Sequence, residues 1–164
     1  MRVLGVDPGL GRTGYAVVEG SAGTLRLLDA GRLDTEPNTD IGTRLVALSE
    51  MLGAVIAACA PDAAAVEQLF FSTNRRTAMQ VAEARGVILF AVARAGVPVA
   101  EYTPAQVKQA VCGYGGAGKQ QVTRMTRALL ALDGNRDDVA DACAIAVCHH
   151  HRARLSAVVQ AATR

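Results

Sequence analysis

Four carboxylates stand where an acidic side chain is unusual. Asp7 and Glu67 each follow a short apolar run, V-L-G-V and A-A-A-V, of the kind that forms a buried strand. Asp138 and Asp141 are three residues apart, so a helix places both on one face, in an otherwise apolar segment. Buried acids are costly unless their charge is compensated. One such acid alone would be interpreted as a turn or cap residue, whereas all four predict a cluster.

Clustered carboxylates need cations. Two of them about 4 Å apart repel by roughly 4 kcal/mol at an effective dielectric of 20. Mg²⁺ suits such a site because it binds a few carboxylate oxygens together with waters and substrate phosphate. Two Mg²⁺ ions per site, with Mn²⁺ able to substitute, would support phosphodiester hydrolysis. Asp137 could also face the site, although a capping role at the start of a helix is the simpler interpretation.

The apolar pattern predicts one α/β domain over residues 1–164, with a mixed five-stranded sheet flanked by helices. Three strands joined by tight turns suggest an antiparallel meander, and strand–helix units follow it. The expected strands cover 2–7, 13–18, 25–33, 63–67 and 97–101. The expected helices run between Asp40 and Pro61, over 74–94, from Thr103 onward, over 119–132, and from 136 to 151 or beyond.

Positive charge is concentrated in the middle of the chain. Residues 1–67 carry five Arg against nine acids, whereas residues 68–132 carry eight Lys or Arg against two. A basic region beside acidic residues suits a nuclease, because phosphates are attracted while carboxylates hold metals. A solvated basic face is at least as common, so the charge pattern is supporting rather than decisive.

The composition also predicts the compartment. No run of about 18 apolar residues indicates a membrane span, and the first residues lack an apolar signal core, so we expect a cytoplasmic protein without membrane contact. The four cysteines form no C-x-x-C pair, which favours a reducing environment. Cys148 precedes three histidines, but zinc ligands usually come as spaced pairs from separate elements.

Two alternative phosphate-binding motifs do not fit the sequence around them. Residues 113–119 fit G-x-x-x-x-G-K, but Gln120 follows where Ser or Thr should bind Mg²⁺, and the preceding residues suggest a helix rather than a strand. We therefore expect a flexible hinge that presents Lys119. The opening V-D-P-G-L-G-R-T-G resembles the phosphate hairpin of actin-like sugar kinases, but those need two domains that 164 residues cannot supply.

Five segments carry a resemblance that covers nearly the whole chain. They are G-V-D-P-G-L-G-R-T-G-Y, A-V-E-Q-L-F-F, A-R-G-V, Q-V-K-Q-A-V-C-G-Y-G-G-A-G-K and D-D-V-A-D-A. Together they are similar to the RuvC-type Holliday-junction resolvases. The resemblance implies an RNase H-like fold, a homodimer, Mg²⁺, and paired symmetric nicks in four-way DNA junctions that leave 5′-phosphates during recombination and repair. It also implies a branch-migration motor complex of the RuvAB type as a partner.

Carried over position by position, the resemblance puts the family's acids on Asp7, Glu67, Asp138 and Asp141. It thus favours Asp138 over Asp137, which spacing alone leaves open.

The resemblance also implies residues that contact DNA. Lys108 and Lys119, the only lysines in the chain, match the family's catalytic or DNA-contacting lysines and would neutralise charge at the scissile phosphate. Phe70 matches an aromatic that stacks on an exposed base, and Asn74 also matches. Arg75 and Arg76 are expected to contact backbone phosphates. The simpler alternatives are solvated lysines and a phenylalanine in the core.

Two further functions are weighed against this one. A junction-binding module without catalysis has no use for four acids facing a phosphate backbone. A ribonuclease of the same fold is compatible with the chemistry, and only the resemblance excludes it.

Overall fold

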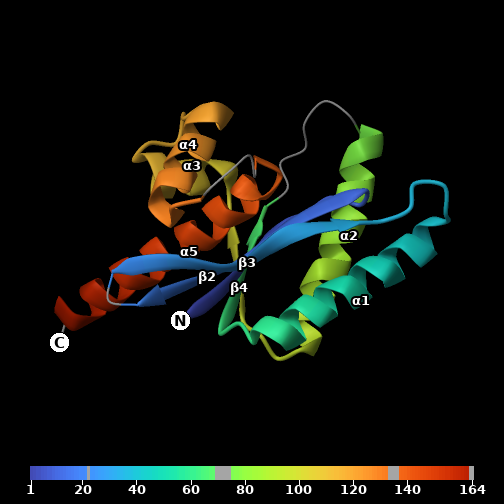
Figure 1. Cartoon of the computed structure of the whole chain (residues 1–164), viewed down its shortest axis with the longest axis horizontal. Coiled ribbons are helices and arrows are strands. Elements are labelled where there is room, and N and C mark those ends of the chain that lie inside the picture. Colours follow the sequence, from blue (N-terminus) through green and yellow to red (C-terminus); the bar gives the residue numbers. More distant parts are fainter. Residues whose placement is uncertain (22, 69–74, 133–136, 163–164) are drawn as a thin grey trace.

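A five-stranded sheet in the order β3-β2-β1-β4-β5 is the frame of the molecule (Figure 1). The computed structural model describes residues 1–21, 23–68, 75–132 and 137–162, without the side chains of 75–77, 137–138 and 157–162. The strands are β1 (Arg2–Asp7), β2 (Arg12–Ser21), β3 (Thr24–Asp34), β4 (Ala63–Glu67) and β5 (Val99–Tyr102). β1 to β3 form an antiparallel meander, and β4 and β5 extend it in parallel beside β1. The predicted mixed sheet is confirmed.

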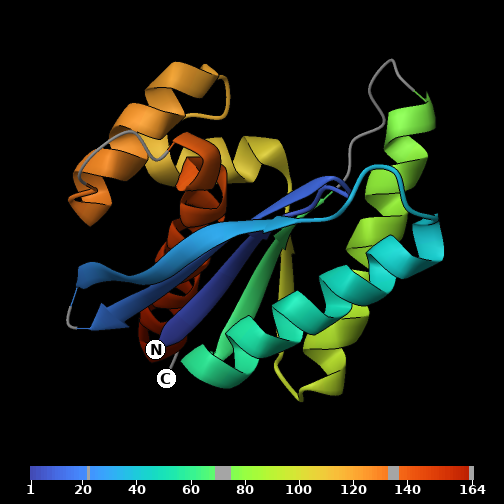
Figure 2. The same cartoon turned by 45° about the vertical axis from the view of Figure 1, so that its right-hand side comes forward.

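Helices cover both faces of this sheet (Figure 2). One face carries α1 (Ile41–Cys59) and α2 (Arg75–Arg94). The other carries α5 (Asp137–Ala162), against which α3 (Pro104–Cys112) and α4 (Lys119–Leu130) pack. Each face has its own apolar core, so the sheet separates two buried layers.

Alternation along the strands decides which side chains enter which layer. In β1, Leu4 and Val6 belong to the core beneath α1 and α2, whereas Val3 belongs to the core beneath α5. Because strand side chains alternate, Gly5 and Asp7 share the α5 face with Val3. In β4, Ala65 likewise belongs to the α5 core. The strand residues that lead to the two acids therefore direct them toward the same layer.

The helix ends follow the expected capping chemistry. Asp40 accepts a hydrogen bond from the Thr43 amide at 3.0 Å and caps α1. The chain turns out of α1 at Ala60, whose φ is 45°, just before Pro61. Thr103 and Gln106 form a reciprocal capping box at the start of α3.

Three predicted boundaries are wrong by two or three residues. β2 ends at Ser21 rather than at residue 18, because its pairing with β3 continues to the Ser21–Thr24 pair. β5 begins at Val99 rather than at residue 97, because the Val97 amide still donates to the Val92 carbonyl at 3.2 Å and completes the end of α2. α4 ends at Leu130 rather than at residue 132, because Ala131 adopts the left-handed conformation with φ 48°.

Among the described residues, α1 is the one helix long and apolar enough to cross a membrane by composition, with a mean hydropathy of 1.5. One stripe of it, Leu48, Leu52 and Ile56, is buried against the sheet, while Ile41 and Val46 remain exposed. That division is typical of a helix that closes a core from one side.

α5 lies unusually close to β1. A Cβ atom added at Gly5 would lie 2.2 Å from the Ala142 carbonyl oxygen and 2.8 Å from the Ala146 amide nitrogen, both in the backbone of α5. Only glycine fits such a contact without displacing the helix. Alanines on the facing side of α5 complete the approach, so the sequence places small residues on both sides of one interface.

Gly5→Ala is therefore expected to lower the free energy of unfolding by about 1–3 kcal/mol or more, because the added methyl group must push α5 away from β1. Urea denaturation measures this difference. Gly53→Ala is the control, since nothing lies within 4 Å of a Cβ added at this position in α1. It should raise stability by up to about 1 kcal/mol. A Gly5→Ala protein as stable as the parent would contradict the close contact.

Candidate active site

The predicted acids and lysines whose side chains are described meet in one cavity of about 190 Å³. Asp7 ends β1 and Glu67 ends β4, and these strands are parallel neighbours, so their carboxyl ends share one edge of the sheet. α5 contributes Asp141, α3 contributes Lys108 and α4 contributes Lys119. Five side chains from five elements thus line one cavity.

The other predicted site residues lie outside what the structure describes. Asp138 belongs to α5, one turn before Asp141, but its side chain is not described. Phe70 and Asn74 precede the described start of α2. Arg75 and Arg76 form the first residues of α2, again without described side chains. The roles of these residues stay predictions.

Burial and mutual repulsion raise the pKa of two of the acids. Burial, followed by the charge of Asp141, raises the pKa of Asp7 to about 6, against an opposing effect of Lys119. Burial, followed by the charges of Asp7 and Asp141, raises the pKa of Glu67 to about 7. Both shifts follow from removing a carboxylate from water and placing it beside others of the same charge. The site therefore favours an added cation.

Among the described residues, Lys119 is a cation in direct contact with one of the acids. Its ammonium group donates to Asp141 at 2.9 Å, while its side chain is 75% exposed and can reach solvent. Lys119 is the first residue of α4 and follows the glycine-rich segment 113–118. That segment joins α3 to α4, so no strand precedes it as a phosphate-binding loop would require. The rejection of that alternative is confirmed.

The donor set fits a hard divalent ion. Asp7, Glu67 and Asp141 offer only carboxylate oxygens, which suit Mg²⁺ or Mn²⁺ rather than zinc. Within the part of the chain that the structure describes, no group of three acids, histidines or cysteines is arranged tightly enough to hold a metal. In this structure Lys119 donates a hydrogen bond to Oδ2 of Asp141.

Comparison with known proteins identifies the family. The family model for "Crossover junction endodeoxyribonuclease RuvC" matches residues 3–149. The RuvC protein of Chloroflexus aggregans is 51% identical over 155 residues, which are 93% of this chain and 94% of that protein. The RuvC protein of Syntrophomonas wolfei is 45% identical over 162 residues, or 98% of this chain and 94% of that one. The chain belongs to the RuvC family of crossover junction endodeoxyribonucleases.

A solved RuvC structure confirms the fold. T. thermophilus RuvC in complex with a Holliday junction substrate is 38% identical and superposes with a TM-score of 0.88, covering 95% of this chain and 96% of that one. The RNase H-like fold predicted from the resemblance is therefore correct.

The three consecutive histidines of this RuvC-family chain have separate hydrogen-bond partners. His149 pairs with the Tyr102 hydroxyl, His150 with the Val18 carbonyl and His151 with the Ala110 carbonyl, each at 2.9 Å. Three different partners on three elements hold the rings apart.

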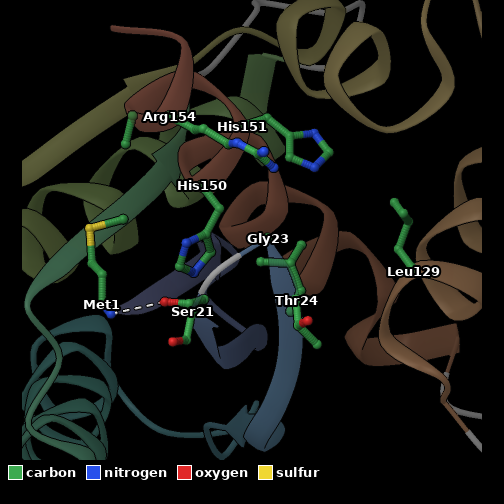
Figure 3. A pocket seen from close by; sticks show the side chains of 11 residues that line it. Met1, Ser21, Gly23, Thr24, Leu129, His150, His151 and Arg154 are labelled. Carbon is green, nitrogen blue, oxygen red and sulfur yellow. Dashed lines mark hydrogen bonds between the residues drawn. The ribbon is translucent and has the colours of Figure 1, made fainter. Parts of the chain in front are cut away.

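A wider cavity of about 880 Å³ lies at the other end of β1, beside Met1 and the β2–β3 turn. Figure 3 shows His150 reaching into it from α5 toward Ser21. No carboxylate is among the described residues that line this cavity, so the smaller acidic cavity is the better candidate for metal-dependent chemistry.

Sequence reasoning missed Arg85. Its Nε donates to the backbone carbonyl of Glu67 at 3.4 Å, and its Nη2 contacts the Glu101 carboxylate. A single arginine within a helix carries no signal of a long-range partner. The A-R-G-V segment containing it contributed to the family resemblance, which does not say what the arginine does.

The raised pKa values predict how pH affects the metal-free protein. In the folded state Asp7 and Glu67 keep protons that the unfolded chain releases near pH 4, so both groups make stability fall as pH rises toward about 6 to 7. Asp7→Asn removes one of the two groups. The melting temperature of this variant in EDTA should therefore fall less steeply between about pH 5 and about pH 8 than that of the parent.

Glu19→Gln is the control for this pH series. Hydrogen bonds from Arg26 and Arg2 lower the pKa of Glu19, so its titration lies below that window and its removal should leave the slope unchanged. Equal slopes in the Asp7→Asn variant and the parent would mean that Asp7 is already ionised in the folded protein at low pH.

Proposed function

We propose that this chain resolves four-way DNA junctions by hydrolysing phosphodiester bonds at the cavity of Asp7, Glu67 and Asp141. The observation that carries the proposal is the convergence of these three carboxylates at the sheet edge where β1 and β4 end. Membership of the RuvC family supports the reaction, since its proteins are named crossover junction endodeoxyribonucleases. The reaction belongs to homologous recombination and DNA repair.

Nucleases of this family depend on metal ions. We propose two Mg²⁺ ions per site, with Mn²⁺ able to substitute, held by Asp7, Glu67, Asp138 and Asp141. When bound, such ions lower the pKa of an attacking water and neutralise the leaving oxygen. The raised pKa values of Asp7 and Glu67 support the assignment, because a divalent cation would relieve the repulsion that causes them.

The chain's own groups have separate tasks. Asp7 and Asp141 both raise the pKa of Glu67, and Asp141 raises that of Asp7, so the three carboxylates act on one another and would together hold the ions. Lys108 and Lys119 line the same cavity and are proposed to neutralise charge that develops on the scissile phosphate. The nick is expected to leave a 5′-phosphate.

The substrate proposal is four-way junction DNA. T. thermophilus RuvC, at 38% identity, has been solved with a Holliday junction substrate. Residues 104–132 around the cavity of this chain contain no acid and four basic residues, which supports attraction of phosphates. We further propose that Phe70 stacks on a base near the crossover and that Asn74, Arg75 and Arg76 contact the backbone.

A homodimer fits the symmetry of the substrate, because a two-fold enzyme offers two identical sites to two like strands. We propose that the outer face of α2 forms the dimer interface. Met79 and Phe90 are 67% and 60% exposed and eleven residues apart, close to three full helical turns, so they share one face. Gly86 lies between them, and nothing is within 4 Å of a Cβ added there. A second copy could therefore approach this face closely.

The remaining proposals follow from the family. We propose that residues 1–164 form a single nuclease domain, that the protein acts in the cytoplasm, and that a branch-migration motor complex of the RuvAB type delivers the junction.

The first test is cleavage of a synthetic mobile four-way junction, with linear duplex and RNA–DNA hybrid as alternative substrates. Paired symmetric nicks in the junction alone, abolished by EDTA, are expected. Asp7→Asn should bind the junction in EDTA like the parent but cut it at least about a hundredfold more slowly in Mg²⁺. Asp34→Asn is the control, because Asp34 forms an exposed ion pair with Arg32 and should cut normally. Preferential attack on the hybrid would instead indicate a ribonuclease.

The dimer is tested by Phe90→Glu. Burying a charge in place of a central aromatic side chain should cost about 2–4 kcal/mol of association free energy, which light scattering during gel filtration detects as a shift to monomer. Cutting should then change from paired to single nicks. Leu155→Glu, at an equally exposed apolar residue of α5, should remain dimeric. A dimeric Phe90→Glu protein would exclude this face as the interface.

A further inference from the structure

Arg85 links three elements at the point where the chain leaves the sheet after Glu67. It lies in α2, its Nη2 contacts the Glu101 carboxylate of β5, and its Nε donates to the Glu67 carbonyl at 3.4 Å. Its side chain is only 20% exposed. An ordinary surface ion pair is worth little, about 0–1 kcal/mol, and does not explain why the same guanidinium also binds main chain.

The contact with Glu67 is made from the opposite side of the sheet. Ala64 and Val66 of β4 belong to the core beneath α1 and α2, whereas Ala65 belongs to the core beneath α5. By alternation the Glu67 side chain is directed to the α5 side, where it lines the acidic cavity. Arg85 approaches from α2 and is not among the residues that line that cavity. It therefore acts on the backbone of Glu67 and does not touch the reacting groups.

Glu67 is at the end of the hydrogen-bonded pairing of β4 with its neighbouring strands. The ladder between β1 and β4 ends at the Val6–Val66 pair. On the β5 side, Glu67 is opposite Tyr102, and the amide of the next residue, Gln68, donates to the Tyr102 carbonyl at 2.8 Å. Arg85 supplies a further hydrogen bond at this point. A carboxylate that ends a strand depends on such contacts for its position, because the described ladders with β1 and β5 end at Val66 and Glu67.

We propose that Arg85 is a positioning residue that holds the main chain of Glu67, and thereby its carboxylate, in register with Asp7 for divalent metal binding. The proposal rests on the proposed role of Glu67 as a metal ligand. Arginine suits the task because its planar fork can bind a carboxylate and a carbonyl at once, whereas lysine offers a single point of charge.

The test is the binding of Mn²⁺ alone, measured by electron paramagnetic resonance, together with single-turnover junction cleavage as a function of Mg²⁺. Arg85→Ala should weaken Mn²⁺ binding by about tenfold or more and raise the Mg²⁺ needed for half-maximal cutting by the same factor. Saturating Mg²⁺ should restore much of the rate, and junction affinity in EDTA should change less than about twofold. Arg85→Lys should recover part of the metal affinity.

Two further variants keep the result decisive. Arg26→Ala removes an arginine from an exposed ion pair with Glu19 and should bind Mn²⁺ like the parent. Glu101→Ala removes only one partner of Arg85, so it should weaken Mn²⁺ binding by less than Arg85→Ala does, and it tests the same link if Arg85→Ala does not fold.

Parental Mn²⁺ affinity in folded Arg85→Ala, even at a lowered melting temperature, would reduce Arg85 to a stabilising contact and overturn the proposal. Loss of junction affinity in EDTA with unchanged Mn²⁺ binding would make Arg85 a DNA contact instead. If Glu67→Gln binds Mn²⁺ like the parent, the role of Glu67 in the proposed function has failed, whatever Arg85 does.

Discussion

The close contact between α5 and β1 is the constraint on which the rest of the structure depends. Gly5 is two residues before Asp7 on the same face of β1, and Ala142 is adjacent to Asp141 in α5. Gly5, which lets α5 approach β1, is thus close to Asp7. The α5 backbone that it contacts, at Ala142, is next to Asp141. A bulkier residue at Gly5 would separate the carboxylates as well as loosen the core, so packing and chemistry share one requirement.

This arrangement opposes the stability of the metal-free protein. Asp7 and Glu67 are buried beside one another and beside Asp141, which raises the pKa of both groups. Lys119 compensates part of the charge through Asp141, yet it is largely exposed and can be released at little cost. The two apolar layers on either side of the sheet hold the acids together in spite of this repulsion. The site therefore gathers negative charge that a cation would compensate.

Much of this could be predicted from sequence because the relevant signals are local. Apolar runs ending in Asp7 and Glu67 marked strand ends, and Asp40 marked a cap, since each depends on a few neighbouring residues. The left-handed cap of α4 at Ala131 could not be predicted, because glycine or asparagine usually takes this conformation. The contact of Arg85 with Glu67 could not be predicted either, because it joins segments that are distant in the sequence. The choice of Asp138 over Asp137 came from the resemblance alone, and the structure does not test it.

The two faces of the sheet carry different functional groups, and the strands between them connect these groups. The α5 face holds the acids, whereas α2 on the opposite face carries Arg85 and an exposed apolar stripe. At the end of a strand, a side chain points to one face of the sheet. The main chain, in contrast, can be contacted from both faces. Because Glu67 is held through its carbonyl, a change in α2 can reach the acidic cavity without any side chain crossing the sheet. The proposed dimer face and the proposed positioning residue Arg85 thus belong to the same helix, so the two proposals share one element of the fold.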